Sequence, residues 1–235
     1  MNLILLFEHE IDVDGRVRLT GRRLEHVRSV LKPAPGARLT VGIADGGIGT
    51  AEVMRLDEDA LDMQVTIGGT PPEPLPLTLV LAVPRPKVLN RVIAAAASLG
   101  IKRIYLVNSW RVEKSYWNSP RMTPENLRAQ SILGLEQAKD TMLPRIETRR
   151  LFRPFVEEEL PSIARGTLAL VPHPRVGRPC PREVREPVTL AIGPEGGFIE
   201  QEIASLERAG FVAVSLGERI LRVETALAAV VGRLF

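Results

Sequence analysis

The residues best placed to do chemistry lie near the C-terminal end of the chain, in two glycine-containing segments. Gly193–Gly197 follows the apolar run Val188–Ile192, and Gly217–Arg222 follows the apolar run Phe211–Leu216. A helix-like pattern of polar and apolar residues begins after each segment. Glycine adopts positive φ and lets a ligand approach the backbone closely. Two such loops favour one ligand held between them, whereas two tight strand-to-helix turns would use glycine without any ligand.

The sequence around these glycines excludes two common phosphate-binding motifs. Gly193–Gly197 lacks the Gly-Lys-Ser/Thr of a Walker A loop and the spacing of G-x-G-x-x-G. The charged residues at the two segments are Glu195, Arg219, Arg222 and Glu224. An arginine is permanently charged, and its planar fork suits phosphates and the edges of bases. A carboxylate in the first turn of a helix, such as Glu224, is often only a favourable partner of the helix dipole.

A second feature is a concentration of basic residues between Gly15 and Arg38, where Glu25 is the single acid. Segregated positive charge is expected where a protein contacts the phosphate backbone of a nucleic acid. The alternative is a solvated face whose arginines form ion pairs. The residues that we predict to contact RNA are Arg16, Arg18, Arg22, Arg23, Arg28 and the neighbouring His26.

A third group, Asn108, Ser109 and Arg111, lies just past the carboxyl end of a predicted strand. Ligands of open α/β sheets bind at that end of the strands, so these residues could face the same crevice as the glycine segments. We predict that Arg111 is a further RNA contact. The nearby aromatic residues Tyr116 and Trp117 could stack on bases, or they could cover a helix.

The sequence predicts no metal site and no hydrolase triad. His9, His26 and His173 are scattered, and H-x-x-x-H, C-x-x-C and G-x-S-x-G are all absent. The single cysteine, Cys180, excludes an internal disulfide and suits a reducing cytoplasm. No neighbour in its proline-rich loop would activate the thiol, so we expect no nucleophilic role.

The elements that must position these residues fall on either side of a proline-rich connector. Pro71–Pro76 carries four prolines in six residues, which makes a stiff linker. Before it, residues 1–70 show short strands and one helix, Gly21–Leu31, and predict a small β-barrel. After it, strands alternate with helices over residues 77–235. This pattern predicts an α/β domain with a largely parallel sheet and helices on both faces.

The predicted strands of the first part are Leu3–Phe7, Val17–Leu19, Arg38–Ile43, Ile48–Leu56 and Leu61–Ile67. Those of the second part are Leu77–Val83, Ile101–Val107, Ile146–Arg149, Thr167–Val171, Val188–Ile192 and Phe211–Leu216. The predicted helices that connect the earlier strands of the second part are Pro86–Leu99, 123–139 and Pro154–Ala164, and one further helix follows each glycine segment.

The bulk composition is that of a globular protein. Of the 235 residues, 45% are hydrophobic and 25% are charged, which argues against bulk disorder. A net charge of +3 permits a nucleic-acid partner without requiring one. No segment approaches the roughly 20 apolar residues that span a bilayer, and the N-terminus lacks the positive region of a signal peptide. We therefore expect a cytoplasmic protein.

Several segments together resemble the signature of the RsmE-type methyltransferases, among them GPEGGFIEQEI and SLGERILRVETA. HVRSVLKPAPGARLTV resembles part of that family's PUA-like barrel, and LTLVLAVPRPKVLNRVIAAAASLGIKRIYLVNSWRVEKS its first strand–helix–strand unit. GLEQAKDTMLP resembles its Glu-Gln helix end. The resemblance implies methylation of N3 of a uridine in small-subunit (16S) ribosomal RNA with S-adenosylmethionine as cofactor. It also implies a homodimer and the SPOUT fold, whose C-terminal chain forms a deep trefoil knot.

By this resemblance, the two glycine segments and a nearby strand end would wrap the cofactor. The implied cofactor-binding residues are Val171, Pro172, Gly193, Pro194, Glu195, Gly196, Gly197, Leu216, Gly217, Ile220, Leu221, Arg222 and Ala226. We expect Arg222 to orient the base or to stabilise its charge. Glu195 and Glu224 are weaker candidates for the proton acceptor or for a contact with the cofactor.

The chain departs from the family pattern in two places. Lys139-Asp140-Thr141 stands where family members often carry an arginine, and Arg91–Ser98 lacks a lysine that is often found in the first helix of the domain. Both departures concern how RNA is held more than the reaction. Two alternatives stay open: a related SPOUT enzyme that acts on another RNA such as transfer RNA, and a non-catalytic RNA-binding factor.

Overall fold

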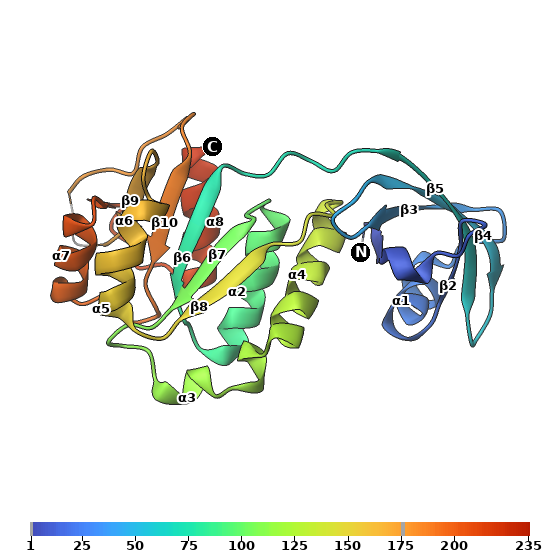
Figure 1. Ribbon diagram of the computed structural model, residues 1–235, viewed down its shortest axis with the longest axis horizontal. Helices are drawn as coiled ribbons and strands as arrows, with labels where there is room; N and C mark the ends of the chain where they lie inside the picture. The colour runs from blue at the N-terminus through green and yellow to red at the C-terminus, as the bar shows by residue number, and fades with distance from the viewer. Residues whose placement is uncertain (1, 175–176) are drawn as a thin grey trace. The chain divides into compact units, whose positions relative to one another are not determined.

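The computed structural model describes residues 2–174 and 177–235, and the chain divides into two compact units. The first unit consists of Met1–Glu73 together with Ile132–Leu143. The second consists of Pro74–Ser131 and Pro144–Phe235. The two units are coloured along the chain in Figure 1. The inclusion of Ile132–Leu143 in the first unit has no signal in the sequence.

The first unit is built on a five-stranded sheet in the order β1-β3-β4-β5-β2. β1 and β3 are parallel, and the other neighbours are antiparallel. Each of the five predicted strands is confirmed to within two residues, and the predicted helix continues from α1 into a π-helical turn, η2. The bounds are β1 Ile4–Leu6, η1 Glu8–Glu10, β2 Arg16–Leu19, α1 Gly21–His26, η2 Val27–Leu31, β3 Arg38–Ile43, β4 Ile48–Leu56 and β5 Leu61–Gly69.

The segment Ile132–Leu143 is bound to the first unit by several hydrogen bonds, and Glu136 is its centre. The carbonyl oxygen of Glu136 accepts from the backbone N–H groups of Asn2 and Leu3 at 2.9 and 3.0 Å. Its carboxylate, 2% exposed, accepts from the guanidinium of Arg22 at 3.0 Å. Both ends of one buried residue are thereby satisfied, as burial of polar groups demands.

The second unit is built on a six-stranded sheet in the order β11-β9-β10-β6-β7-β8, in which every neighbouring pair is parallel. The predicted parallel sheet is thus confirmed. The strands are β6 Leu77–Ala82, β7 Arg103–Val107, β8 Arg145–Arg149, β9 Leu168–Pro172, β10 Val188–Ile192 and β11 Val212–Val214. The helices and helical turns are α2 Pro86–Ser98, α3 Lys114–Trp117, η3 Pro120–Met122, α4 Pro124–Ala138, α5 Phe152–Pro154, η4 Phe155–Glu159, α6 Leu160–Ile163, α7 Glu200–Arg208 and α8 Val223–Leu234.

The two central strands, β6 and β10, are buried at every residue. A strand that is covered on both faces must be apolar on both, which explains why these two strands form continuous hydrophobic runs. Figure 1 shows α2 and α8 on one side of the sheet and α5, α6 and α7 on the other. Helices on both faces were predicted, and the structure confirms them.

Several details differ from the sequence prediction. The predicted helix Pro154–Ala164 is divided into α5, η4 and α6, in which a π-helical turn replaces part of the regular helix. The strand predicted to begin at Ile101 begins at Arg103, because the N–H of Ile101 bonds to the carbonyl oxygen of Ala96 and closes the end of α2. Helix α3 was not predicted.

The strand order reverses between β6 and β10. The chain runs outward from β6 through β7 to β8. It then returns to the other half of the sheet, where β10 lies next to β6, β9 next to β10, and β11 at the edge. At such a switch point the loops beyond the carboxyl ends of the strands diverge and leave a crevice. The glycine segments follow β10 and β11, so the fold places both of them at that edge.

Candidate functional site

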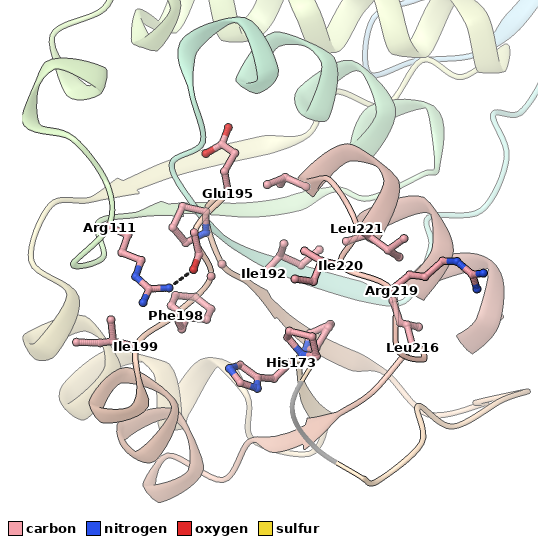
Figure 2. A pocket seen from close by; sticks show the side chains of 18 of the residues that line it. Arg111, His173, Ile192, Glu195, Phe198, Ile199, Leu216, Arg219, Ile220 and Leu221 are labelled. Carbon is pink, nitrogen blue, oxygen red and sulfur yellow. Dashed lines mark hydrogen bonds between the residues drawn. The ribbon is translucent and has the colours of Figure 1, made fainter.

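A cavity of about 490 Å³ lies at the carboxyl ends of β9, β10 and β11 (Figure 2). Its walls come mainly from two loops, which we call the first glycine loop (Gly193–Gly197) and the second glycine loop (Leu216–Arg222). The residues predicted to bind the cofactor that line it are Pro172, Gly193, Pro194, Glu195, Gly196, Gly197, Leu216, Gly217, Ile220, Leu221 and Ala226. Residues from three strand ends therefore meet around one space.

Two residues predicted to bind the cofactor, Val171 and Arg222, do not line the cavity. Val171 is fully buried within β9. Arg222 is exposed and occupies the N-cap position of α8. Glu224, a weaker candidate for the proton acceptor or for a cofactor contact, lies in the first turn of α8 and pairs with Arg91 of α2 at 3.1 Å.

The first glycine loop is fixed by hydrogen bonds to its own backbone and to its neighbours. The N–H of Gly197 donates to the carbonyl oxygen of Pro194 at 2.8 Å and closes a turn. The carboxylate of Glu195 accepts the N–H of Arg85, the residue before α2, at 2.9 Å. In Figure 2 this carboxylate points away from the other lining residues. Glu195 thus joins the loop to the start of α2.

Gly193 has no room for a side chain. A Cβ at this position would lie 2.9 Å from the backbone nitrogen of Phe198 and 3.2 Å from backbone carbon atoms of Gly197. Backbone atoms cannot move aside independently, so a larger residue would force the whole turn to shift. The glycine is required here by close packing within the loop.

Arg111 covers the first glycine loop from the loop that follows β7. Its guanidinium donates to the carbonyl oxygen of Gly196, as the dashed line in Figure 2 marks. The neighbouring N–H of Trp110 is bound by the carboxylate of Glu202 at 2.7 Å, and the same carboxylate accepts the N–H of Ile199 at 3.0 Å. Glu202 is only 7% exposed. Arg111, predicted as an RNA contact, therefore lines the cavity.

The second glycine loop is held by fewer contacts. Gly217 has φ of +120°, a conformation that glycine adopts without strain, and a Cβ there would meet no atom within 4 Å. Its N–H donates to the hydroxyl of Ser215 at 3.1 Å. Ile220 lines the cavity and is nevertheless 82% exposed. Arg219 lies at the edge of the cavity, and Figure 2 shows its guanidinium directed outward.

Sequence reasoning missed part of the lining. The residues not predicted are His173, Pro174, Ile192, Phe198, Ile199, Glu200, Gln201, Arg219 and Val223. Arg219 lies within the segment Gly217–Arg222, and each of the others adjoins a predicted segment, so extending the two glycine segments and the strand end by a few residues would have found them. Glu202 was also missed. Its position three residues after the N-cap of α7, Ile199, is that of an acidic helix-capping residue, which was the available signal.

The two aromatic residues after β7, Tyr116 and Trp117, form contacts within the protein. Trp117 is 9% exposed, and its indole N–H donates to the side-chain oxygen of Asn108 at 3.0 Å. The guanidinium of Arg150 lies 5.4 Å from its ring centre. Burial raises the pKa of Tyr116, and the hydrogen bond from its hydroxyl to Glu113 adds to the shift. Trp117 therefore packs within its own unit, and its ring is not exposed for stacking on a base.

The basic residues of the first unit are largely paired. Four predicted RNA contacts form ion pairs. Folding brings a distant acid to three of them: Arg18 pairs with Asp62 at 3.3 Å, Arg22 with Glu136 at 3.0 Å and Arg23 with Glu10 at 2.5 Å. Arg28 pairs with the nearby Glu25 at 2.9 Å. In the part of the chain that the structure describes, no ion pair involves the exposed Arg16, Lys32 or Arg38. The Nε2 atom of His26 is buried without a partner.

The pair of Arg23 and Glu10 is structural. Arg23 is 18% exposed and also donates to the carbonyl oxygen of Leu5 at 2.9 Å. Burial alone would raise the pKa of the Glu10 carboxyl, but the hydrogen bonds from Arg23 and from the N–H of Phe7 outweigh it and lower the pKa below its ordinary value. The charged form of Glu10 is thus the form that the folded unit stabilises.

Cys180 is buried, and burial raises the pKa of its thiol, as expected for a protonated core residue. Among residues 2–174 and 177–235, no cluster of three His, Cys, Asp or Glu residues could hold a metal ion. No helix in those ranges is long and apolar enough to cross a membrane.

The fold and the cavity define the class of the protein as an α/β RNA methyltransferase: a family model described as "RNA methyltransferase domain" matches residues 71–234. The chain belongs to the ribosomal RNA small subunit methyltransferase E family. The relative of that name from Treponema pallidum is 34% identical over 233 residues, which cover 96% of this chain and 88% of the relative. The relative from Synechocystis is 27% identical over 91% of this chain and 71% of its own length.

Two solved structures are similar over almost the whole chain. A methyltransferase of Legionella pneumophila in complex with the bound cofactor SAM has a TM-score of 0.75 and 26% identity, and covers 98% of this chain and 94% of its own. The ribosomal RNA small subunit methyltransferase E of Neisseria gonorrhoeae, bound to S-adenosyl methionine, has a TM-score of 0.73 and 25% identity. It covers 98% of this chain and 95% of its own.

Proposed function

We propose that this protein transfers the methyl group of S-adenosylmethionine to N3 of a uridine in small-subunit (16S) ribosomal RNA. The observation that carries the proposal is the cavity at the carboxyl ends of β9, β10 and β11, lined by both glycine loops. Family membership supports the reaction, and the bound ligand named for the Legionella and Neisseria structures supports the cofactor. The choice of N3 rests on the sequence resemblance.

The residues of the cavity suit S-adenosylmethionine. Its size, about 490 Å³, falls in the range of small-molecule sites, which mix apolar walls with a few polar groups. Gly193, Gly196 and Gly197 line the cavity without side chains, so their backbone groups can meet a ligand directly. Apolar side chains, including Ile192, Leu216 and Ala226, would hold the non-polar parts of the cofactor. Val171 would act from behind this wall, within β9.

Uracil N3 carries a proton and is a poor nucleophile until that proton leaves. Bound S-adenosylmethionine would supply a methyl group from its sulfonium sulfur, which leaves as a neutral thioether and needs no acid. The protein must therefore align the base and stabilise the negative charge that develops on the uracil oxygens. We propose Arg222 for this role. It is exposed beside the cavity at the start of α8, and within the described residues it forms no ion pair.

The two carboxylates suit the proton-acceptor role less well. Glu224 is paired with Arg91, and Glu195 already accepts the N–H of Arg85. Because Glu195 lines the cavity, we retain it as a contact of the cofactor and as an anchor of the first glycine loop. Glu224 would act on the reaction only through its place beside Arg222.

We further propose that residues 1–70 form a PUA-like RNA-binding domain, joined by the linker 71–76 to a SPOUT domain, residues 77–235, with a C-terminal trefoil knot. The support is the resemblance of both segments, together with the five-stranded sheet and the parallel sheet. We also propose a homodimer and, because the substrate is ribosomal RNA, a cytoplasmic location.

RNA contact by the first unit would use its free cations first. The double variant Arg16→Glu, Arg38→Glu reverses two exposed charges that have no ion pair within the described residues. It should weaken binding of 16S ribosomal RNA roughly tenfold and reduce the salt dependence of binding, because each cation releases counterions from the phosphates. Binding of S-adenosylmethionine should not change. Equal RNA affinity would remove this surface from the RNA interface.

The experiment that tests the proposed function is mass-spectrometric mapping of the nucleosides of 16S ribosomal RNA from cells with and without the gene. We expect one N3-methyluridine to disappear and to return when the purified protein and S-adenosylmethionine are added to unmodified subunits. An unchanged ribosomal map would overturn the assignment of substrate. A methylated transfer RNA in the same cells would then favour the related enzyme, and no cofactor binding at all would favour the non-catalytic factor.

A further inference from the structure

We propose that Trp110 is an aromatic platform on which a base of the RNA substrate stacks, and that buried Glu202 holds it in position. The inference deepens the proposed function and rests on it. Trp110 is 80% exposed, whereas Trp117, the chain's other tryptophan, is 9% exposed. The exposed tryptophan adjoins Arg111, which lines the cavity.

The backbone around Trp110 forms a tight turn that is anchored at both ends. The N–H of Val112 donates to the carbonyl oxygen of Ser109 at 3.0 Å, so Trp110 and Arg111 occupy the two corners of the turn. Ser109 is 3% exposed and Val112 is 8% exposed. The two corner side chains therefore face outward while the flanking residues are packed inside.

Turn geometry gives no reason for a tryptophan at this place. Corners of tight turns favour Gly, Pro, Asn, Asp and Ser, each for a conformational reason that an indole does not share. An exposed tryptophan also leaves a large apolar surface in water. An exposed indole beside a cavity that suits a methyl donor offers a flat aromatic face, and the partner of matching chemistry is a nucleobase.

Glu202 anchors the turn through hydrogen bonds. Its carboxylate binds the N–H of Trp110 at 2.7 Å and the N–H of Ile199, before α7, at 3.0 Å. One buried carboxylate thus fixes the Trp110 turn and the wall of the cavity to each other. Arg111 adds a second connection through its bond to the carbonyl oxygen of Gly196. The backbone that carries the indole is thus fixed before a base binds, which lowers the conformational cost of binding.

The charges of the same loop suit RNA. Arg111 and Lys114 are exposed, and Glu113 is the single acid between Trp110 and Trp117. Aromatic side chains flanked by cations are the usual means of holding unstacked bases, because the ring binds the face of the base and the cations bind phosphates. Single-stranded or flipped-out nucleotides meet this requirement, and paired ones do not.

The test uses the full-length protein, unmodified 16S ribosomal RNA made by transcription in vitro, and tryptophan fluorescence. Stacking on Trp110 should quench the emission of the wild-type protein and shield it from iodide. Trp110→Phe should keep RNA affinity within about threefold yet lose the quenching, since the remaining Trp117 is buried. Trp110→Ala should weaken RNA binding about ten- to hundred-fold, with unchanged affinity for S-adenosylmethionine. Leu151→Ala, which shortens another exposed apolar side chain (68% exposed), is the matched control.

Glu202 is tested by the same measurements. Glu202→Gln keeps one acceptor oxygen but turns an amide N–H₂ toward a backbone donor, so the turn should loosen. We expect weaker RNA quenching and a raised KM for RNA, while Glu207→Gln, an exposed position in the same helix, should behave as wild type. A Glu202→Gln variant with wild-type quenching would overturn the positioning role.

The outcomes separate this inference from the proposed function. A wild-type protein that binds and methylates the RNA without any change in emission would overturn the stacking role alone, as would equal RNA affinity of Trp110→Ala. Emission that changes on dilution of the protein and not with RNA would overturn it too, and would assign Trp110 to a contact between copies. Absence of binding and of methyl transfer both with free RNA and with unmodified subunits would overturn the proposed function with it.

Discussion

The two glycine loops line the same cavity, yet they are held in different ways. The first glycine loop is fixed by the turn at Gly197, by Glu195 on Arg85 and by Arg111 on Gly196. The second is held by two hydrogen bonds between Gly217 and the side chain of Ser215, the residue before the loop, and its Ile220 is largely exposed. A binding site can thus combine a preformed wall with one that a ligand must order. Few buried contacts are the mark of the second kind.

The largest expected effect is the loss of methyl transfer on changing Arg222, at the end of the second glycine loop. Arg222→Ala should lower the rate of methyl transfer about 100-fold, the usual loss when one group that stabilises developing charge is removed. Single-turnover assays with saturating S-adenosylmethionine measure it. Arg208→Ala, an exposed arginine on α7, controls for loss of surface charge. Wild-type turnover in Arg222→Ala would remove Arg222 from the chemistry.

Gly193→Ala tests whether the first glycine loop is as rigid as its packing indicates. The new Cβ would meet the backbone nitrogen of Phe198 at 2.9 Å, so the loop must move. Affinity for S-adenosylmethionine should fall about 10- to 100-fold, as overpacking costs about 1–3 kcal/mol. Isothermal titration calorimetry gives the value. An affinity close to wild type would mean that the first loop adapts as readily as the second.

Gly217→Ala is the matched change in the second glycine loop. Here a Cβ has space, and only the backbone angle of +120° opposes it. The expected loss of affinity is about fivefold to tenfold, smaller than at Gly193, because the strain of about 1–2 kcal/mol can relax in a loop with few contacts. The same titration compares the two alanine variants. If Gly217→Ala were the more damaging, the assignment of rigid and adaptable walls would be reversed.

Glu195→Gln has the smallest expected effect on methyl transfer. It also distinguishes whether Glu195 is an anchor of the first glycine loop or a general base. Glu195→Gln keeps an oxygen that can accept the N–H of Arg85, so an anchor should retain methyl transfer within about threefold. Glu195→Ala should raise the KM for S-adenosylmethionine severalfold, because the first loop loses its connection to α2. A loss of about 100-fold or more in Glu195→Gln would identify the carboxylate as a general base instead.

The sequence predicted what local patterns encode. The continuous apolar runs of β6 and β10 and the glycines after β10 and β11 each leave a signal within a few residues, and the parallel sheet follows from their alternation with helices. These features identified the two loops that line the cavity, and the resemblance to the RsmE-type family supplied the other predicted lining residues. The missed lining residues, such as Phe198, adjoin segments that were identified.

The sequence could not show partners that are distant along the chain. Glu202 binds Trp110 across 92 residues, and Glu136 binds Arg22 across 114. No periodicity encodes such pairs, since each depends on where the finished fold brings two segments. The same reason explains the basic residues of the first unit, whose cations appeared unopposed until folding supplied Glu10, Asp62 and Glu136.

The contribution of Ile132–Leu143 to the first unit has a consequence for synthesis on the ribosome. When Glu73 has been made, the N–H groups of Asn2 and Leu3 and the guanidinium of Arg22 still lack the partners that Glu136 will provide. Domains usually fold in order from the N-terminus as the chain emerges. This first unit cannot be completed until β6, α2, β7 and α4 have been translated, so a completed first unit implies that residues Pro74–Ser131 of the second unit have already been made.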